Sequence, residues 1–409
     1  MRLLGDWLTR FDGLLDGEFQ VLCFAIPRRY VLSLSLVVLV KLAMAAALYF
    51  YLGIGSEMTF WMDPSKVAPL PQNEILLSGN GAFRWAYLFL GWDSAWYASI
   101  ASSGYSFSSQ SFAFMPGLPA LASLFGVFLS NPLPAIAFIC LISGVLWITL
   151  FESVAEHYMG RREAFLGTLM FALSPFTLLF TTVAYSEGLF LLLTLTAWKL
   201  YLDKRYFSAS LASALVTLVR IPGFLIVLPM IVGLLSSRER VFRLKDLLIL
   251  APSAFVLLLW AGFMWLSTGD PIALFHNSEW SGMYTLPTYL TGILPSVGLE
   301  ALCFPVPYLN IHWFLSTAIW GSILLLPFLT WRLYKFDRGL VLYCLAYITG
   351  VLVFGAVVSL PRFMAVLFPL WLPVAGLLRG RRWSPLLAIA SIAVCFILWA
   401  GFIGGVFVG

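Results

Sequence analysis

Charge is scarce in this sequence of 409 residues: 11% are Asp, Glu, Lys or Arg, whereas 61% are hydrophobic. A mean hydropathy of +0.94 excludes a water-soluble globular domain and predicts an all-α protein that crosses a membrane several times. The net charge of +5 does not indicate nucleic acid as a partner, because basic residues in such a chain report its topology. The sixteen tryptophans are typical of aromatic belts at two membrane surfaces.

Several common signatures are missing as well. The three histidines exclude a histidine-rich zinc site, and the five cysteines form neither a disulfide framework nor a Cys-x-x-Cys motif. The sequence has no Asn-x-Ser/Thr site, no low-complexity segment and no two-fold repeat like that of many secondary transporters. Residues 1–29 lack the basic start and cleavage site of a signal peptide, so we expect a cytoplasmic or interfacial helix there.

Apolar stretches long enough to cross a membrane recur from residue 30 onward, and basic loops separate many of them. Because loops rich in Arg and Lys stay in the cytoplasm, they place the N-terminus there and leave long external loops at about 53–130 and 269–311. The alternation of apolar stretches and basic loops predicts one domain, 30–409, with about 11 transmembrane helices. The expected spans are 30–52, 131–153, 163–182, 188–202, a hairpin over 208–236, 247–267, 312–331, 339–359, 363–378 and 384–407.

Three features interrupt these apolar stretches. Pro116 and Pro119 weaken any span over 113–130, so we expect a juxtamembrane or re-entrant helix on the external side. The segment 220–223, Arg-Ile-Pro-Gly, breaks the hairpin and should bring its arginine toward the outer half of the bilayer. Lys41 lies near the middle of the first span, where we expect it to pair with an acid.

Asp93 is a lone carboxylate between Trp92 and Trp96, with Tyr97 one residue further on, in the first external loop. A carboxylate among aromatic residues near a membrane surface suits a general base. The alternatives are a solvated loop acid or a cap for the helix that follows.

Arg220 and Arg362 lie within or at the edge of membrane segments, where charged groups are expensive and usually functional. A guanidinium binds phosphate oxygens in bidentate fashion, so two of them suit a lipid-linked phosphate. For Arg362 the alternative is a side chain that snorkels to the lipid headgroups.

The second external loop adds Asp270, in a Gly-Asp-Pro sequence that is ordinary turn chemistry, and His276. His276 and Glu279 have the spacing of half a metal site, which Asp93 or Asp270 could complete. A hard divalent ion on carboxylates therefore stays an alternative, and no cofactor is assigned.

Taken in chain order, these segments resemble the PIG-V family of mannosyltransferases, within the membrane-embedded glycosyltransferases of the GT-C fold. The resemblance covers about residues 90–375. The segments that carry it are 92–97, 100–101, 104–105, 113–119, 185–190, 220–223, 269–271 with Trp280, and 361–363.

The resemblance implies a GT-C fold and a polyprenyl- or dolichyl-phosphate mannose donor, from which mannose passes with inversion to a glycan or glycolipid acceptor at the outer membrane face. For such a transfer, we hypothesise that Asp93 is the catalytic residue, which orients or deprotonates the acceptor hydroxyl, and that Arg362 with Arg220 holds the donor phosphate. The residues expected to contact substrate are Trp92, Trp96, Tyr97, Glu187, Asp270 and His276. Segment 106–112 departs from the family pattern, so the acceptor identity does not carry over.

The short chain and its plain loops favour a prokaryotic, archaeal member in a plasma membrane, and a eukaryotic member would lie in the endoplasmic reticulum. Two other functions stay open at this point. One is a polytopic transporter of lipids or solutes, with Arg220 and Lys41 lining a pathway. The other is a GT-C transferase of another lipid-linked sugar.

Overall fold

The computed structural model describes residues 13, 15–21, 24–51, 88–105, 109–129, 132–236, 243–276, 311–353, 359–377 and 384–403. Within this part of the chain, four segments are long and apolar enough to cross a membrane: Arg28–Phe50, Pro132–Tyr158, Asp246–Thr268 and Pro385–Ile403. The predicted class, an all-α polytopic membrane protein, is confirmed. The total of about 11 crossings stays a prediction, as do the sidedness and the division into domains.

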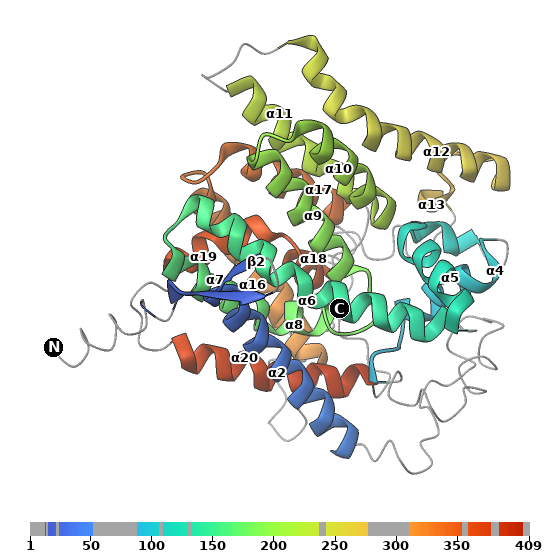
Figure 1. The fold of residues 1–409 in the computed structure, drawn as a ribbon. Helices are drawn as coiled ribbons and strands as arrows, with labels where there is room; N and C mark the ends of the chain where they lie inside the picture. Colours follow the sequence, from blue (N-terminus) through green and yellow to red (C-terminus); the bar gives the residue numbers. More distant parts are fainter. Residues whose placement is uncertain are drawn as a thin grey trace, which may run out of the picture.

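The helices follow one another along the chain, as Figure 1 shows. The first half contains α2 (Arg28–Tyr51), α4 (Asp93–Ser103), the 3-10 helix η2 (Ser109–Ala113), α5 (Gly117–Leu129), α6 (Pro132–Tyr158), α7 (Arg161–Ala172), α8 (Pro175–Phe180) and α9 (Glu187–Leu202). The second half contains α10 (Tyr206–Val219), η3 (Ile221–Ile226), α11 (Val227–Ser236), η4 (Leu244–Leu250), α12 (Ala251–Thr268), α13 (Ala273–His276), α16 (Ile311–Leu333), α17 (Arg338–Val353), α18 (Leu360–Ala365), η7 (Phe368–Leu370), α19 (Trp371–Leu377) and α20 (Ser384–Ile403).

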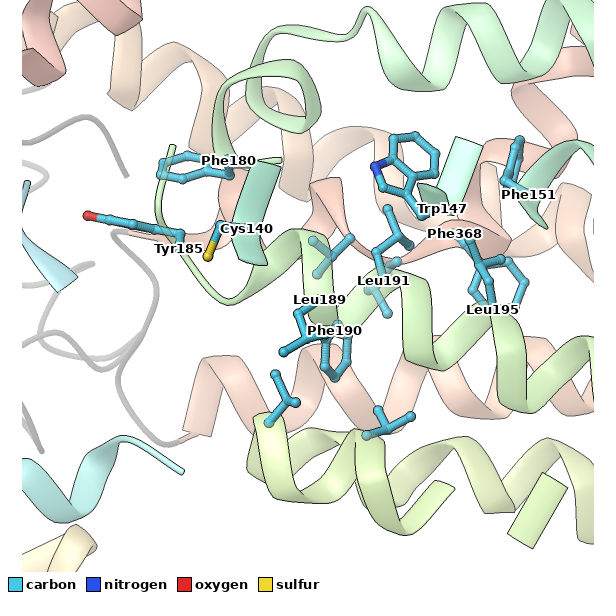
Figure 2. Packing of buried hydrophobic residues seen from close by; sticks show 14 of the residues in the cluster. Cys140, Trp147, Phe151, Phe180, Tyr185, Leu189, Phe190, Leu191, Leu195 and Phe368 are labelled. Atoms are coloured by element: carbon cyan, nitrogen blue, oxygen red, sulfur yellow. The ribbon is translucent and has the colours of Figure 1, made fainter. Parts of the chain in front are cut away.

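Helices α6 and α9 pack against each other at the centre of the fold. A Cβ added at Gly188 of α9 would lie 2.9 Å from the Cα of Gly144 in α6, so the absence of side chains allows this close approach. Large buried side chains fill the space along the two helices, as Figure 2 shows for Cys140, Trp147, Phe151, Leu189, Phe190, Leu191 and Leu195. The first residue of α9, Glu187, is thereby fixed relative to α6.

Prolines divide several apolar stretches into short helices. The expected single span 163–182 is two helices, because α7 ends at Ala172 and α8 begins at Pro175, whose ring removes a backbone donor. The expected break at 220–223 is present between α10 and η3. Helix α5 has 13 residues, which gives about 20 Å and is too short for a hydrocarbon core of about 30 Å. A juxtamembrane or re-entrant α5 therefore fits the structure.

Lys41 pairs differently from the expectation. Its Nζ donates to the carbonyl oxygens of Gly144 at 2.7 Å and Thr181 at 2.8 Å, and to the hydroxyl of Thr181 at 3.0 Å. The expected acidic partner is thus replaced by backbone oxygens. Gly144 and the end of α8 present these oxygens because the chains approach closely there.

The N-terminal segment also differs from the expectation. Over residues 18–27 of the expected helix, strands β1 (Glu18–Val21) and β2 (Phe24–Pro27) form an antiparallel hairpin that pairs Glu18 with Pro27, and residues 1–12 lie outside the described residues. Polar and apolar residues alternate in β1, which suits a strand with a period of two. Much of both external loops, 53–87 and 277–310, lies outside the described residues.

Candidate active site

Asp93 is the first residue of α4, and an unusual turn holds it in place. Trp92, directly before it, has φ 48° and ψ −111°, a backbone conformation that residues other than glycine rarely adopt. The Ser94 hydroxyl closes this turn by donating to the Gly91 carbonyl at 2.7 Å and accepting from its N–H at 3.0 Å. The backbone N–H of Asp93 points to the Tyr185 hydroxyl, 3.4 Å away.

The segment before Asp93 is tied to two distant parts of the chain. The Phe89 carbonyl accepts from the Ala184 N–H at 2.7 Å, and the Leu88 carbonyl accepts from the Trp399 indole at 2.8 Å. These bonds bring Asp93 beside residues 185–187, which precede and begin α9.

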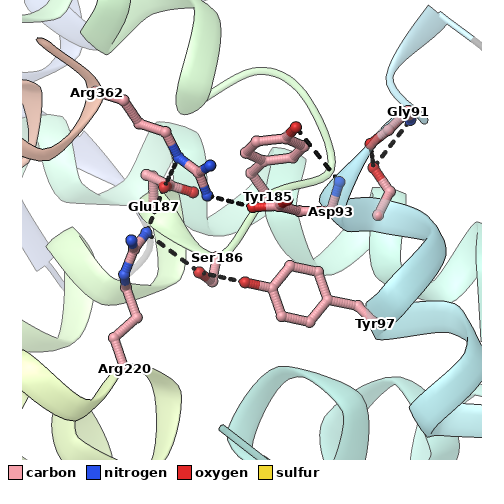
Figure 3. A network of polar contacts seen from close by, with 9 residues as sticks. Gly91, Asp93, Tyr97, Tyr185, Ser186, Glu187, Arg220 and Arg362 are labelled. Carbon is pink, nitrogen blue, oxygen red and sulfur yellow. Dashed lines mark hydrogen bonds and ion pairs between the residues drawn. The ribbon is translucent and has the colours of Figure 1, made fainter. Parts of the chain in front are cut away.

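Arg362, on the short helix α18, joins two carboxylates (Figure 3). Its Nη2 donates to Oδ2 of Asp93 at 2.6 Å, and its Nε donates to Oε1 of Glu187. Cζ of Arg362 lies over the ring of Tyr185, 4.4 Å from the centroid of that ring. The Arg362 side chain is 7% exposed, so it is held inside the protein and does not snorkel.

Arg220 reaches the same glutamate from the other side. It lies in extended backbone between α10 and η3, and its Nη1 donates to Oε1 of Glu187. The same Nη1 lies 3.5 Å from the Ser186 hydroxyl, which also accepts from the Tyr97 hydroxyl at 2.8 Å. The predicted break after α10 thus brings this arginine into the site.

Glu187 is the centre of this arrangement. Its side chain is 0% exposed, whereas those of Asp93 and Arg220 are 25% and 11% exposed. Burial raises the pKa of Glu187, but the charges of Arg220 and Arg362 outweigh this effect and hold the pKa below its ordinary value. The two guanidiniums therefore favour the ionised form of this carboxylate.

The structure thus brings together Asp93, Glu187, Arg220 and Arg362, and we call these four residues the charge cluster. Tyr97 supports the cluster through Ser186. The sequence interpretation gave no role to Tyr185 and Ser186, although both lie in the family-like segment 185–190. Their place in that segment is the sequence signal that could have identified them as site residues.

Three other predicted site residues, Trp96, Asp270 and His276, are not members of the charge cluster. Trp96 is buried and stacks on Phe114 with ring centroids 5.6 Å apart, which is core packing beside the site. Asp270 lies in the turn after α12, where its Oδ1 accepts the N–H of Ile272 at 3.0 Å. His276 ends α13, which packs against η2.

Among the described residues, no group of three or more His, Cys, Asp and Glu side chains could hold a metal ion. Glu279, the expected partner of His276, lies outside the described residues. The charge cluster contains two carboxylates and two arginines, and both arginines pair with Oε1 of Glu187.

The family model of the PIG-V mannosyltransferases matches residues 79–268, which include Asp93, Glu187 and Arg220. The chain is similar to GPI alpha-1,6-mannosyltransferase 2 of Rattus norvegicus, with 32% identity over 226 residues, 52% of this chain and 42% of the relative. For the Homo sapiens protein of that name, identity is 34% over 144 residues, 32% of this chain and 29% of the relative. The matches thus span less than half the length of these relatives.

Two solved structures of the Archaeoglobus fulgidus oligosaccharyltransferase also resemble this chain. The apo form has a TM-score of 0.46 at 15% identity and covers 92% of this chain and 56% of that one. The form tethered to an acceptor peptide has a TM-score of 0.44 at 15% identity, with 92% and 55% covered.

Proposed function

We propose that this chain, whose residues 79–268 belong to the PIG-V mannosyltransferase family, is an inverting membrane mannosyltransferase of the GT-C type. Mannose moves from a polyprenyl- or dolichyl-phosphate donor to a lipid-linked or glycan acceptor at the outer membrane face. The observation that carries the proposal is Arg362, which holds Asp93 and Glu187 in one cluster with Arg220.

The transfer needs a base and a positive site for the leaving group. The acceptor hydroxyl oxygen attacks the anomeric carbon of mannose from the face opposite the phosphate, and its proton passes to Asp93. The bond between the anomeric carbon and the phosphate oxygen breaks, and its electron pair stays on that oxygen. Arg362 and Arg220 stabilise the charge that develops there. A phosphate leaving group is a weak base, so no acid is required to protonate it.

Charge balance supports this division of roles. The charge cluster is neutral while Asp93 is ionised, and it gains one positive charge when Asp93 takes the acceptor proton. The leaving phosphate gains one negative charge in the same step. The proton transfer therefore places compensating charges on either side of the reacting sugar, where they attract each other.

The arrangement favours an enzyme over a transporter. In a transporter, we would expect Arg220 and Lys41 to line a common pathway. Lys41 instead lies closed in by the oxygens of Gly144 and Thr181, while Arg220 belongs to the charge cluster. Asp93, at 25% exposure, remains accessible to a substrate.

The direct test is transfer by the purified protein. The protein is incubated with one donor, which is dolichyl-phosphate mannose, polyprenyl-phosphate mannose or a lipid-phosphate glucose, and with candidate glycan and glycolipid acceptors. The masses of the products are determined by mass spectrometry. We expect an acceptor heavier by one hexose from a mannose donor. Transfer from glucose alone would assign another lipid-linked sugar, and no transfer with any pair would contradict the proposal.

A further inference from the structure

We propose that Glu187 is a positioning residue of the transfer reaction: it holds the two arginines side by side so that they bind one phosphate group together. This inference rests on the proposed function and names how its donor site is built. It also changes the role expected for Glu187, which the sequence analysis places among the residues that contact substrate.

Burial separates Glu187 from any substrate. Its side chain is 0% exposed, and its Oε1 accepts from both Nη1 of Arg220 and Nε of Arg362. The Arg362 guanidinium therefore lies between this carboxylate and the accessible Asp93. Glu187 acts on a substrate only through the two arginines.

The two arginines need such an anchor because they come from different elements and carry like charges. Arg220 follows α10, and Arg362 lies on α18, 142 positions later in the chain. Two buried guanidiniums repel each other unless a negative charge lies between them. A single carboxylate oxygen shared by both arginines supplies that charge and brings them together at one point.

Glu187 also orients Arg362. Its bond to Nε fixes one edge of the guanidinium, and the Nη2 corner is then directed at Asp93. The guanidinium donors that are not used by Glu187 and Asp93 are left for a phosphate. Because Gly188 packs against Gly144, the backbone that carries this anchor is held by α6 and α9 rather than by a loop.

The test measures phosphate binding apart from transfer. Farnesyl phosphate is the probe, and its Kd is measured by isothermal titration calorimetry on the full chain in detergent. We expect Glu187→Gln to weaken binding by about tenfold or more, because the arginines lose their shared charge. The donor KM should rise to a similar degree, while the acceptor KM stays within about twofold.

Two further variants make the test specific. Glu152→Gln is the matched control, because Glu152 of α6 is equally buried, accepts from Ser33 at 2.6 Å and lies outside the charge cluster. It should bind farnesyl phosphate within about twofold of the wild type. Glu187→Asp keeps the charge on a shorter side chain and should restore part of the lost affinity.

The outcomes separate this role from the proposed function. A folded Glu187→Gln protein that binds farnesyl phosphate as tightly as the wild type overturns the positioning role alone. If Glu187→Gln does not fold, wild-type affinity in Glu187→Asp overturns it in the same way. A wild-type protein that binds the probe in a Glu187-dependent manner but transfers no mannose overturns the proposed function and leaves this role standing.

Discussion

Nη2 of Arg362 donates to Oδ2 of Asp93 at 2.6 Å, across 269 positions of sequence. The proposed base and the proposed phosphate-binding residue are therefore in contact. A donor phosphate that binds Arg362 meets Asp93 at the same guanidinium. This pairing links the two halves of the proposed reaction and is the source of the first prediction.

Replacing Arg362 by Lys should raise the donor KM by about tenfold or more. An ammonium is a point charge and cannot keep both the Glu187 bond and a forked contact to phosphate. Steady-state kinetics with varied donor and saturating acceptor measure the effect. The control is Arg161→Lys, because Arg161 pairs with Asp16 at the exposed surface, where an ion pair contributes little. An unchanged donor KM in Arg362→Lys would remove Arg362 from the donor site.

The positive φ of Trp92 predicts a difference between two truncations. Trp92→Gly and Trp92→Ala both remove the indole, but only glycine adopts this backbone conformation without strain. Trp92→Gly should therefore have a free energy of unfolding about 1 kcal/mol greater than Trp92→Ala. Denaturant melts in detergent measure the difference.

The control pair for Trp92 lies in the same helix. At Ala98, inside α4, glycine should be less stable than the native alanine by about 0.5–1 kcal/mol. The sign of the comparison thus reverses between the two positions. Equal stability of the two Trp92 variants would show that the turn is not strained.

Gly188→Ala should destabilise the protein by about 1–3 kcal/mol and lower the transfer rate. The added Cβ would lie 2.9 Å from the backbone N and Cα of Gly144, so α6 and α9 must separate and Glu187 must shift. Gly262→Ala in α12 is the control, since its Cβ meets nothing within 4 Å and alanine favours the helix. A Gly188→Ala protein with wild-type melting temperature and rate would contradict the account of the helix contact.

The sequence predicted the positions of most apolar helices, but it predicted only some of the breaks between them. Hydropathy located the apolar helices, and the proline in 220–223 located the break that carries Arg220. The similar break at Ser174-Pro175 was missed because no charged residue interrupts residues 164–182. The N-terminal hairpin was missed because a segment of mixed polarity fits a helix and a strand equally well.

The site was predicted in part. Asp93, Arg220 and Arg362 were identified because isolated charges in an apolar chain are conspicuous, and the structure brings all three together. The central place of Glu187 was not predictable, since it depends on contacts made 33 and 175 positions away. The prediction of an acidic partner for Lys41 was wrong for a related reason: its partners are two backbone carbonyls and the Thr181 hydroxyl, 103 and 140 positions away.

Transfer by Asp93→Asn tests the central claim most directly. Asparagine keeps the size of the side chain and an oxygen that can accept from Arg362, but it cannot take the acceptor proton. We predict a kcat lower by about 10²- to 10⁴-fold, with farnesyl phosphate binding retained and the melting temperature close to that of the wild type. A folded Asp93→Asn protein that transfers mannose at a near-normal rate would contradict the account.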